Sequence, residues 1–114
     1  MRRLGLVLAL LLISRPVSAD YHSARDFSHF CFMGLDTANT RFRLGYIVGV
    51  AQVLNNVTRS GGSLYGQRAC LPLDLNQGQA SAVVRKFLDG QPGLLHLSPD
   101  RLIAAALSEA FPCD

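Results

Sequence analysis

The sequence has no apolar run long enough to cross a lipid bilayer. The longest such run, residues 4–13, is about half of the ~20 residues that a membrane-spanning helix needs, and Arg15 closes it. Two arginines precede the run, and small residues that suit signal peptidase lead up to Ala19. We therefore expect residues 1–19 to be a secretory signal peptide cleaved after Ala19, and the mature protein to be periplasmic with no membrane anchor. The absence of a cysteine after the cleavage region also argues against a lipoprotein.

The expected mature chain lacks any surplus of positive charge. The whole sequence carries 11 Lys and Arg against 8 Asp and Glu, but Arg2, Arg3 and Arg15 belong to the expected signal peptide, and 11 minus 3 leaves 8 basic residues. A protein that binds nucleic acid needs a basic face to displace counterions from phosphates, and no run of lysine or arginine supplies one. The composition therefore argues against nucleic acid as a partner.

The sequence also lacks a convergent set of acid, base and nucleophile. His22, His29 and Cys31 lie in a short stretch, but none of them is paired at the three- or four-residue step that places two metal ligands on one helix face. Nothing in the sequence marks Cys31 as an activated nucleophile. We therefore expect no enzymatic activity, no cofactor and no metal.

Cysteine is scarce, with only Cys31, Cys70 and Cys113. Thiols pair in the oxidising compartment outside the cytoplasm, and any one pairing leaves a cysteine over. We prefer Cys70 with Cys113, because Cys70 precedes Pro72 at the entrance to a helical region and Cys113 ends the chain after Pro112. Such a bond would tie down the C-terminal helix of a domain whose size makes its stability marginal when it rests on hydrophobic burial alone. On the loop-closure estimate it stabilises the fold by about 4 kcal/mol.

No strand pattern of comparable strength competes with four helical segments. The sequence predicts an all-α, four-helix bundle-like domain over residues 20–114, held by one disulfide. The first helix is expected over residues 23–34. The second helix is expected to begin after the N-cap Asp36, and the third to begin near Asn76 and end at Gly90. The fourth is expected to begin at Pro99, with Ser98 as its N-cap.

The second segment is the longest and carries apolar residues at steps of three and four. This spacing predicts a buried stripe of Phe42, Tyr46, Gly49, Val50, Val53 and Val57, which Ile47, Val48 and Leu54 widen until most of the helix is covered. We interpret Gly45 and Gly49 as a small-residue face for close helix contact. The later helices are expected to bury Ala80, Val83, Val84, Phe87 and Leu88, and Leu102, Ile103, Ala106, Leu107 and Ala110.

Two irregular segments, residues 55–69 and 90–98, are the candidate partner-binding loops. Exposed tyrosine and arginine are frequent in interface hot spots, and a Ser-Gly-Gly-Ser run marks the first segment as an exposed loop. The candidates are Arg59, Tyr65 and Arg68 in the first loop and Leu94, Leu95 and His96 in the second. The alternative for the same residues is an ordinary solvated loop.

Three motifs occur in order along the chain: Gly45-Tyr46-Ile47-Val48-Gly49-Val50, Cys70-Leu71-Pro72 and Ala110-Phe111-Pro112-Cys113. Together they resemble the Tai-type family of type VI secretion amidase immunity proteins, over nearly the whole mature chain. The resemblance implies a small helical periplasmic protein that binds and blocks a peptidoglycan-cleaving amidase toxin and has no catalysis of its own.

Two positions depart from that family. Arg43 stands where many relatives carry a cysteine, so the resemblance leaves Cys31 as a buried free thiol or as a link between two chains in a homodimer. Gln52 stands where an acidic residue often follows the Gly-Val pair.

Two functional hypotheses follow. The leading one is an immunity-like inhibitor that occludes the active-site cleft of its partner with an inserted loop. The alternative is a periplasmic structural or chaperone-like envelope protein whose apolar helices pair with clients or with a second copy. A neutral chain with few ionisable groups in its helices argues against an acid-triggered switch in this second role.

Overall fold

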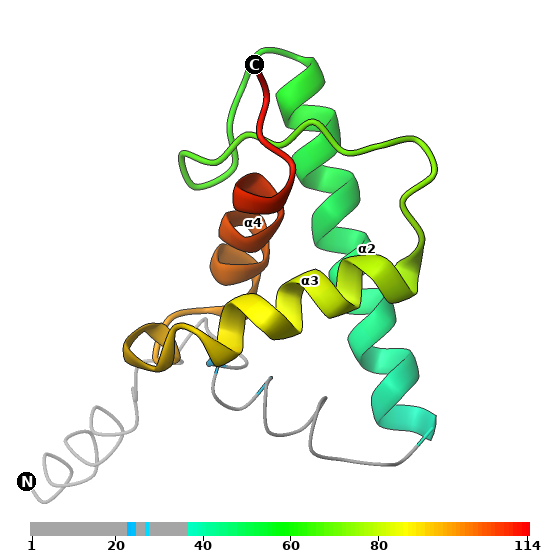
Figure 1. Ribbon diagram of the computed structural model, residues 1–114, viewed down its shortest axis with the longest axis vertical. Coiled ribbons are helices and arrows are strands. Elements are labelled where there is room, and N and C mark those ends of the chain that lie inside the picture. The colour runs from blue at the N-terminus through cyan, green and yellow to red at the C-terminus, as the bar shows by residue number, and fades with distance from the viewer. Residues whose placement is uncertain (1–22, 25–26, 28–36) are drawn as a thin grey trace, which may run out of the picture.

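The computed structural model describes residues 23–24, 27 and 37–114 of the 114-residue chain. These residues form three α-helices, α2 (Thr37–Arg59), α3 (Gln77–Asp89) and α4 (Pro99–Ala110), and one short 3-10 helix, η1 (Pro92–Leu94) (Figure 1). The all-α prediction is confirmed for this part of the chain. A four-helix bundle is not shown, because the helix expected over residues 23–34 lies mostly outside the described residues. The predicted signal peptide and Cys31 lie outside them entirely.

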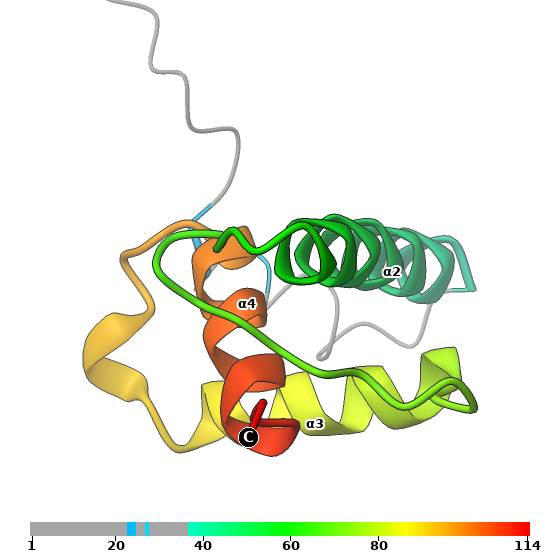
Figure 2. The same ribbon diagram turned by 90° about the horizontal axis from the view of Figure 1, so that it is seen from above.

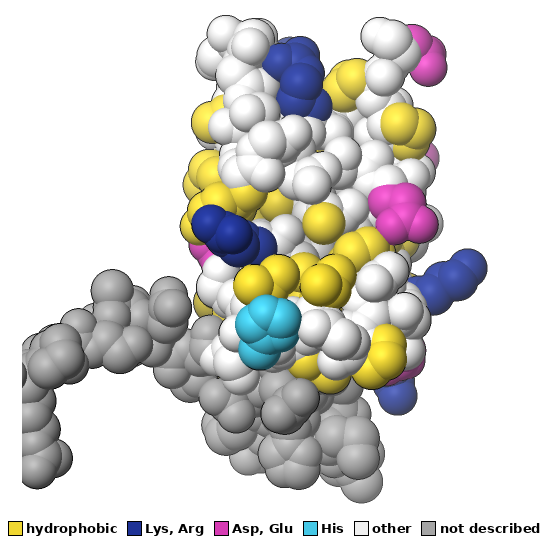
Figure 3. Space-filling model, turned by 90° about the vertical axis from the view of Figure 1, so that its left-hand side faces the viewer, with side chains coloured by type: hydrophobic (Ala, Val, Ile, Leu, Met, Phe, Trp, Pro, Cys, Tyr) yellow, Lys and Arg dark blue, Asp and Glu magenta, His cyan; other side chains and the backbone are white. Residues whose placement is uncertain are grey.

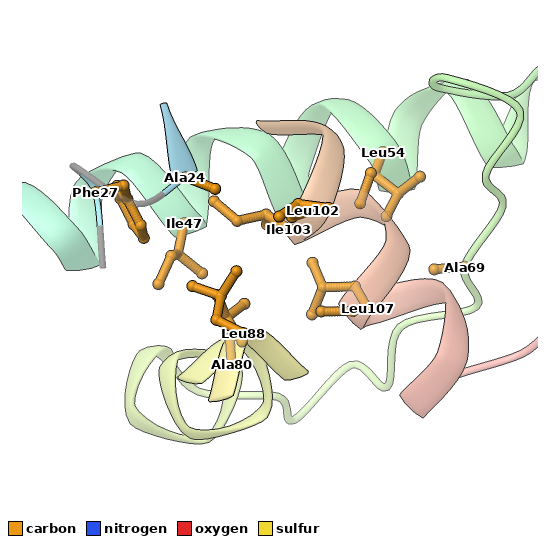
Figure 4. Close-up of a cluster of buried hydrophobic side chains, with 13 residues drawn as sticks. Ala24, Phe27, Ile47, Leu54, Ala69, Ala80, Leu88, Leu102, Ile103 and Leu107 are labelled. Atoms are coloured by element: carbon orange, nitrogen blue, oxygen red, sulfur yellow. The ribbon is translucent and has the colours of Figure 1, made fainter. Parts of the chain in front are cut away.

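The three helices enclose one core. Each helix contacts the other two, and the view from above shows α2 and α3 along opposite sides of the domain with α4 packed across them (Figure 2). The side chains that fill the centre are aliphatic, with Ile47 and Leu54 from α2 facing Ile103 and Leu107 from α4 (Figure 4). From α3 the core receives Ala80, Val84 and Leu88. In the described residues, no helix combines the length and the apolar character of a membrane span.

Residues before α2 also contribute to the core. Ala24 and Phe27 are buried, and the backbone N–H of Ala24 donates a hydrogen bond to the carbonyl of Leu97 at 2.6 Å. The Phe27 ring packs on Tyr46 with 5.1 Å between ring centroids. Ala24 and Phe27 therefore close the end of the core that lies near the start of α4.

The face of α2 that enters the core is not centred on the predicted stripe. Ile47, Leu54 and Thr58 are buried, whereas Phe42 and Val53 remain 42% and 49% exposed. The stripe prediction is wrong at Phe42, Gly49 and Val53, and so is the expectation that most of the helix would be covered. Apolar residues surround most of α2, so their spacing did not specify which face packs against α3 and α4.

The small-residue face of α2 makes no close helix contact. Gly45 and Gly49 are exposed, and a Cβ built on either would meet nothing within 4 Å. The interpretation of these glycines as a packing site between helices is therefore wrong within the described structure. They form an exposed strip without side chains on the outside of α2.

The start of α3 follows from local sequence. The Asn76 side chain accepts a hydrogen bond from the backbone N–H of Gln79 at 2.8 Å, and the Gln79 side chain accepts one from the N–H of Asn76 at 3.1 Å. This capping box satisfies two backbone donors that a helix start leaves open. The predicted start near Asn76 and the end at Gly90 are both confirmed.

Three details of the other helices differ from expectation. α4 begins at Pro99 as predicted, but the Ser98 side chain makes no capping hydrogen bond, and Ala110 is exposed because the helix ends there, at the edge of the core. α2 continues to Arg59, so the first five residues of the expected loop 55–69 are helical.

The predicted disulfide is present. Cys70 and Cys113 are bonded, with their Cα atoms 5.1 Å apart and a sequence separation of 43. The backbone N–H of Cys70 also donates to the carbonyl of Phe111 at 2.9 Å. Both links fasten the end of the chain to the segment that leads from α2 into α3.

Candidate functional site

Tyr65 occupies a tight turn between α2 and α3. Leu64 and Gln67 exchange backbone hydrogen bonds of 2.9 and 2.8 Å, so only Tyr65 and Gly66 lie between them. Both have positive φ, 52° and 76°, as a two-residue hairpin turn of the I′ type requires. Glycine adopts this conformation freely, whereas a tyrosine there is uncommon and needs support from its surroundings.

The support comes from the first turn of α4. The Tyr65 hydroxyl donates a hydrogen bond to the Asp100 carboxylate, and the Arg101 guanidinium lies over the Tyr65 ring at 4.9 Å from its centroid. The ring nevertheless remains 48% exposed. Tyr65 is thus an aromatic side chain held in one orientation and offered to solvent, which is the form that interface anchors take.

Charge and burial shift two pKa values in this region. Partial burial opposes ionisation of Asp100, but hydrogen bonds from the side chains of Tyr65 and Ser98 and from backbone N–H groups outweigh it, so its pKa lies below the ordinary value. Burial raises the pKa of Tyr46, and the negative charge of Asp100 raises it further. The carboxylate therefore stays charged, and the Tyr46 phenol stays neutral, across the physiological range.

We expect the folded state to lose the stabilising contribution of Asp100 in acid. Because the folded pKa is lowered, that contribution is complete above the ordinary value of 3.8 and disappears as the pH falls through the lower folded value. In the Asp100→Asn variant, the midpoint of urea unfolding should depend less on pH in acid. The pKa of Tyr46, read from phenolate absorbance, should move toward 10.0. Asp74→Asn, at an exposed carboxylate, is the control; an Asp100→Asn variant that follows the wild-type acid profile would contradict the assignment.

Arg68 has a structural task. Its Nη1 donates to the carbonyl of Gly62 at 2.8 Å and its Nη2 to the carbonyl of Thr58 at 3.3 Å. The Thr58 hydroxyl in turn accepts from the backbone N–H of Ala69 at 3.2 Å. These bonds satisfy a carbonyl in the last turn of α2 and shape the loop that follows. Arg68 therefore positions the loop that carries Tyr65.

The second predicted loop lies on the same side of the molecule as the Tyr65 turn. Figures 1 and 2 both place residues 60–68 and η1 on the left. Leu94 and His96 are exposed there, whereas Leu95 is half-buried and packs on the core. Figure 3 views this side, and His96, the single histidine of the described residues, lies beside hydrophobic side chains. We call the surface formed by Tyr65, Arg101, Leu94 and His96 the loop face.

Arg59 is exposed and lies in a different place, at a groove that the sequence did not reveal. The groove has a volume of about 570 Å³ and lies between α2, the segment of residues 69–76 and the start of α3. A polar wall of Gln52, Asn55 and Asn56 on α2 faces apolar side chains that include Leu71 and Leu75. The one signal in the sequence was the carboxamides at positions 52, 55 and 56, which share a helix face. Their partners across the groove are set only by the tertiary fold.

The described residues contain no group of three or more His, Cys, Asp and Glu that could hold a metal ion.

Comparison with known families identifies the chain. A model described as Rap1a immunity proteins matches residues 23–113. Searches of the curated proteins and of the solved structures found no match. The family match supports the class expected from the sequence, an amidase-linked type VI immunity protein that is not an enzyme, under the Rap1a description; the Tai-type designation is not shown. The chain therefore belongs to the Rap1a immunity protein family, whose members are not enzymes and confer immunity against a type VI secreted effector.

Proposed function

We propose that this protein is a periplasmic immunity protein that binds a peptidoglycan amidase delivered by type VI secretion and blocks its active site. The observation that carries the proposal is the family match over residues 23–113. The resemblance of the three sequence motifs to amidase immunity proteins supports the choice of toxin class. The disulfide between Cys70 and Cys113 supports export, because such bonds persist in oxidising compartments.

The loop face is the proposed contact with the active-site cleft. Tyr65 is already oriented by Asp100 and Arg101, so binding would order few further side-chain torsions. Leu94 and His96 extend the same surface with an apolar and a polar group. Of the six residues predicted from sequence, Tyr65, Leu94 and His96 keep a direct role in this proposal. Arg68 contributes by holding the loop, and Leu95 by anchoring its segment to the core.

The proposal is tested by producing the protein together with amidases directed to the periplasm. We expect the full chain to prevent lysis by a cognate amidase, and a version without residues 1–19 to give no protection because it stays away from the toxin. Tyr65→Ala combined with Leu94→Asp should weaken protection, with Ala82→Asp at an exposed position of α3 as the matched surface control. Lysis that is unchanged by the full chain across the whole set would refute an amidase-directed function.

The predicted homodimer and the structural or chaperone-like alternative share one surface. Phe42, Gly45, Gly49 and Val53 form an exposed strip on α2 that could pair with a second copy or a client. Light scattering with and without reductant tests the dimer. A monomer under both conditions would argue against a link through Cys31 and against pairing through this strip.

A further inference from the structure

The groove between α2 and the start of α3 has the size and the lining of a binding site. Its volume of about 570 Å³ lies within the range typical of ligand pockets, roughly 300–1,000 Å³. Val48, Ala51, Leu71 and Leu75 give it apolar walls. Leu73, on its rim, is fully exposed to solvent. An aliphatic side chain entering the groove would therefore exchange water for apolar contacts on several sides.

One wall of the groove carries hydrogen-bonding groups that the fold does not use. The side chains of Gln52, Asn55 and Asn56 make no hydrogen bond within the described structure. Each carboxamide can donate and accept at once. An extended peptide presents free N–H and C=O groups along its backbone, whereas a helix has already paired its own. The row of three carboxamides thus suits an extended segment.

The charge that lines the groove is positive. Among the described residues that line it, Arg59 is the one that carries a charge. Gln77, at the N-terminal end of α3, also lines the groove, and the first turn of this helix carries no acidic side chain. The partial positive charge of the helix end therefore adds to that of Arg59. A carboxylate complements this lining.

We propose that this groove receives an extended segment of the effector that carries an aliphatic side chain and a carboxylate. The aliphatic group contacts Leu71, Leu73 and Leu75, the backbone pairs with the carboxamides of α2, and the carboxylate pairs with Arg59. This inference rests on the proposed function for the identity of the partner. It gives the protein a second contact, through which it holds the toxin while the loop face covers the cleft.

The first experiment measures binding of a neutralised amidase to groove variants by calorimetry. Leu73→Asp and Arg59→Gln change exposed residues, so both variants should fold, which circular dichroism checks. We expect each to raise the dissociation constant at least about tenfold, as loss of an interface anchor does, while the control Ala82→Asp, at an exposed position of α3 that does not line the groove, binds as wild type. If both groove variants bind as wild type while the loop-face variants lose binding, the groove inference is overturned and the proposed function stands.

A second experiment needs no effector, so that it separates the groove from the proposed function. The probe is the blocked pentapeptide acetyl-Gly-Leu-Gly-Glu-Gly-amide at millimolar concentration, with the Gln analogue as the uncharged control. We expect NMR shifts at the side-chain amides of Gln52, Asn55 and Asn56, weaker shifts with the analogue, and loss of this difference in Arg59→Gln. Absence of shifts in the groove, or equal shifts with both peptides, would overturn the inference whether or not an amidase is neutralised.

Discussion

Replacing Cys70 and Cys113 with serine is expected to lower the free energy of unfolding by about 4 kcal/mol. The bond joins residues 43 positions apart, and on the loop-closure estimate it restricts the unfolded chain by that amount. For a domain of this size the loss corresponds to a fall in Tm of roughly 15–30 °C. Thermal unfolding followed by circular dichroism measures it.

Reduction of the wild-type protein provides the matched comparison. It should reproduce the behaviour of the double variant, and reductant should then have no further effect on the variant. A double variant that unfolds within a few degrees of the oxidised wild type would show that hydrogen bonds such as that from Cys70 N–H to Phe111 hold the tail without the covalent bond. The result also bears on function, because Cys70 lines the groove.

Leu54→Ala is expected to cost about 2–5 kcal/mol, whereas Val53→Ala should change stability by less than about 0.5 kcal/mol. The two residues are neighbours on α2, but Leu54 is fully buried on the side that faces α4 and Val53 is 49% exposed. Truncating Leu54 leaves a cavity that rigid neighbouring helices fill only in part. Chemical denaturation of the two variants measures the difference.

The comparison of these two variants tests how α2 is oriented about its own axis. The sequence pattern placed Val53 within a buried stripe and Leu54 beside it. Similar losses for both variants, or a larger loss for Val53→Ala, would mean that α2 is turned differently about its axis. The groove and the exposed strip would then both be misplaced, because Asn55 and Asn56 turn with the helix.

The helix starts were predictable because their causes are local. Asn76 and Gln79 form their capping box within four residues, and Pro99 can start a helix but not continue one. The disulfide was predictable for a related reason. With few cysteines and an expected oxidising compartment, only three pairings were open, and the one between Cys70 and Cys113 fastened the C-terminal helix to the middle of the chain.

The candidate site was predictable only in part. Tyr65 was recognised as an exposed aromatic residue, but its partners Asp100 and Arg101 lie 35 positions away or more, and no local pattern joins them. Arg68 was chosen by residue type, which carries no information on whether its donors turn outward or, as here, to the carbonyls of Thr58 and Gly62. The groove was missed because its two walls meet only after α2 and α3 pack.

The amino-acid sequence by itself determined the helical class, both ends of α3, the start of α4 and the immunity-protein class, and it favoured the disulfide pairing that the structure has. Caps, turn residues, cysteine number and motif order act over short distances or are read directly. Tertiary structure alone decided which face of α2 is buried, which candidate residues are tied within the fold, and where a groove exists. α2 is apolar around most of its circumference, so several orientations satisfy its sequence. Only the shapes of the α3 and α4 surfaces select Leu54 for the core and leave Val53 in water.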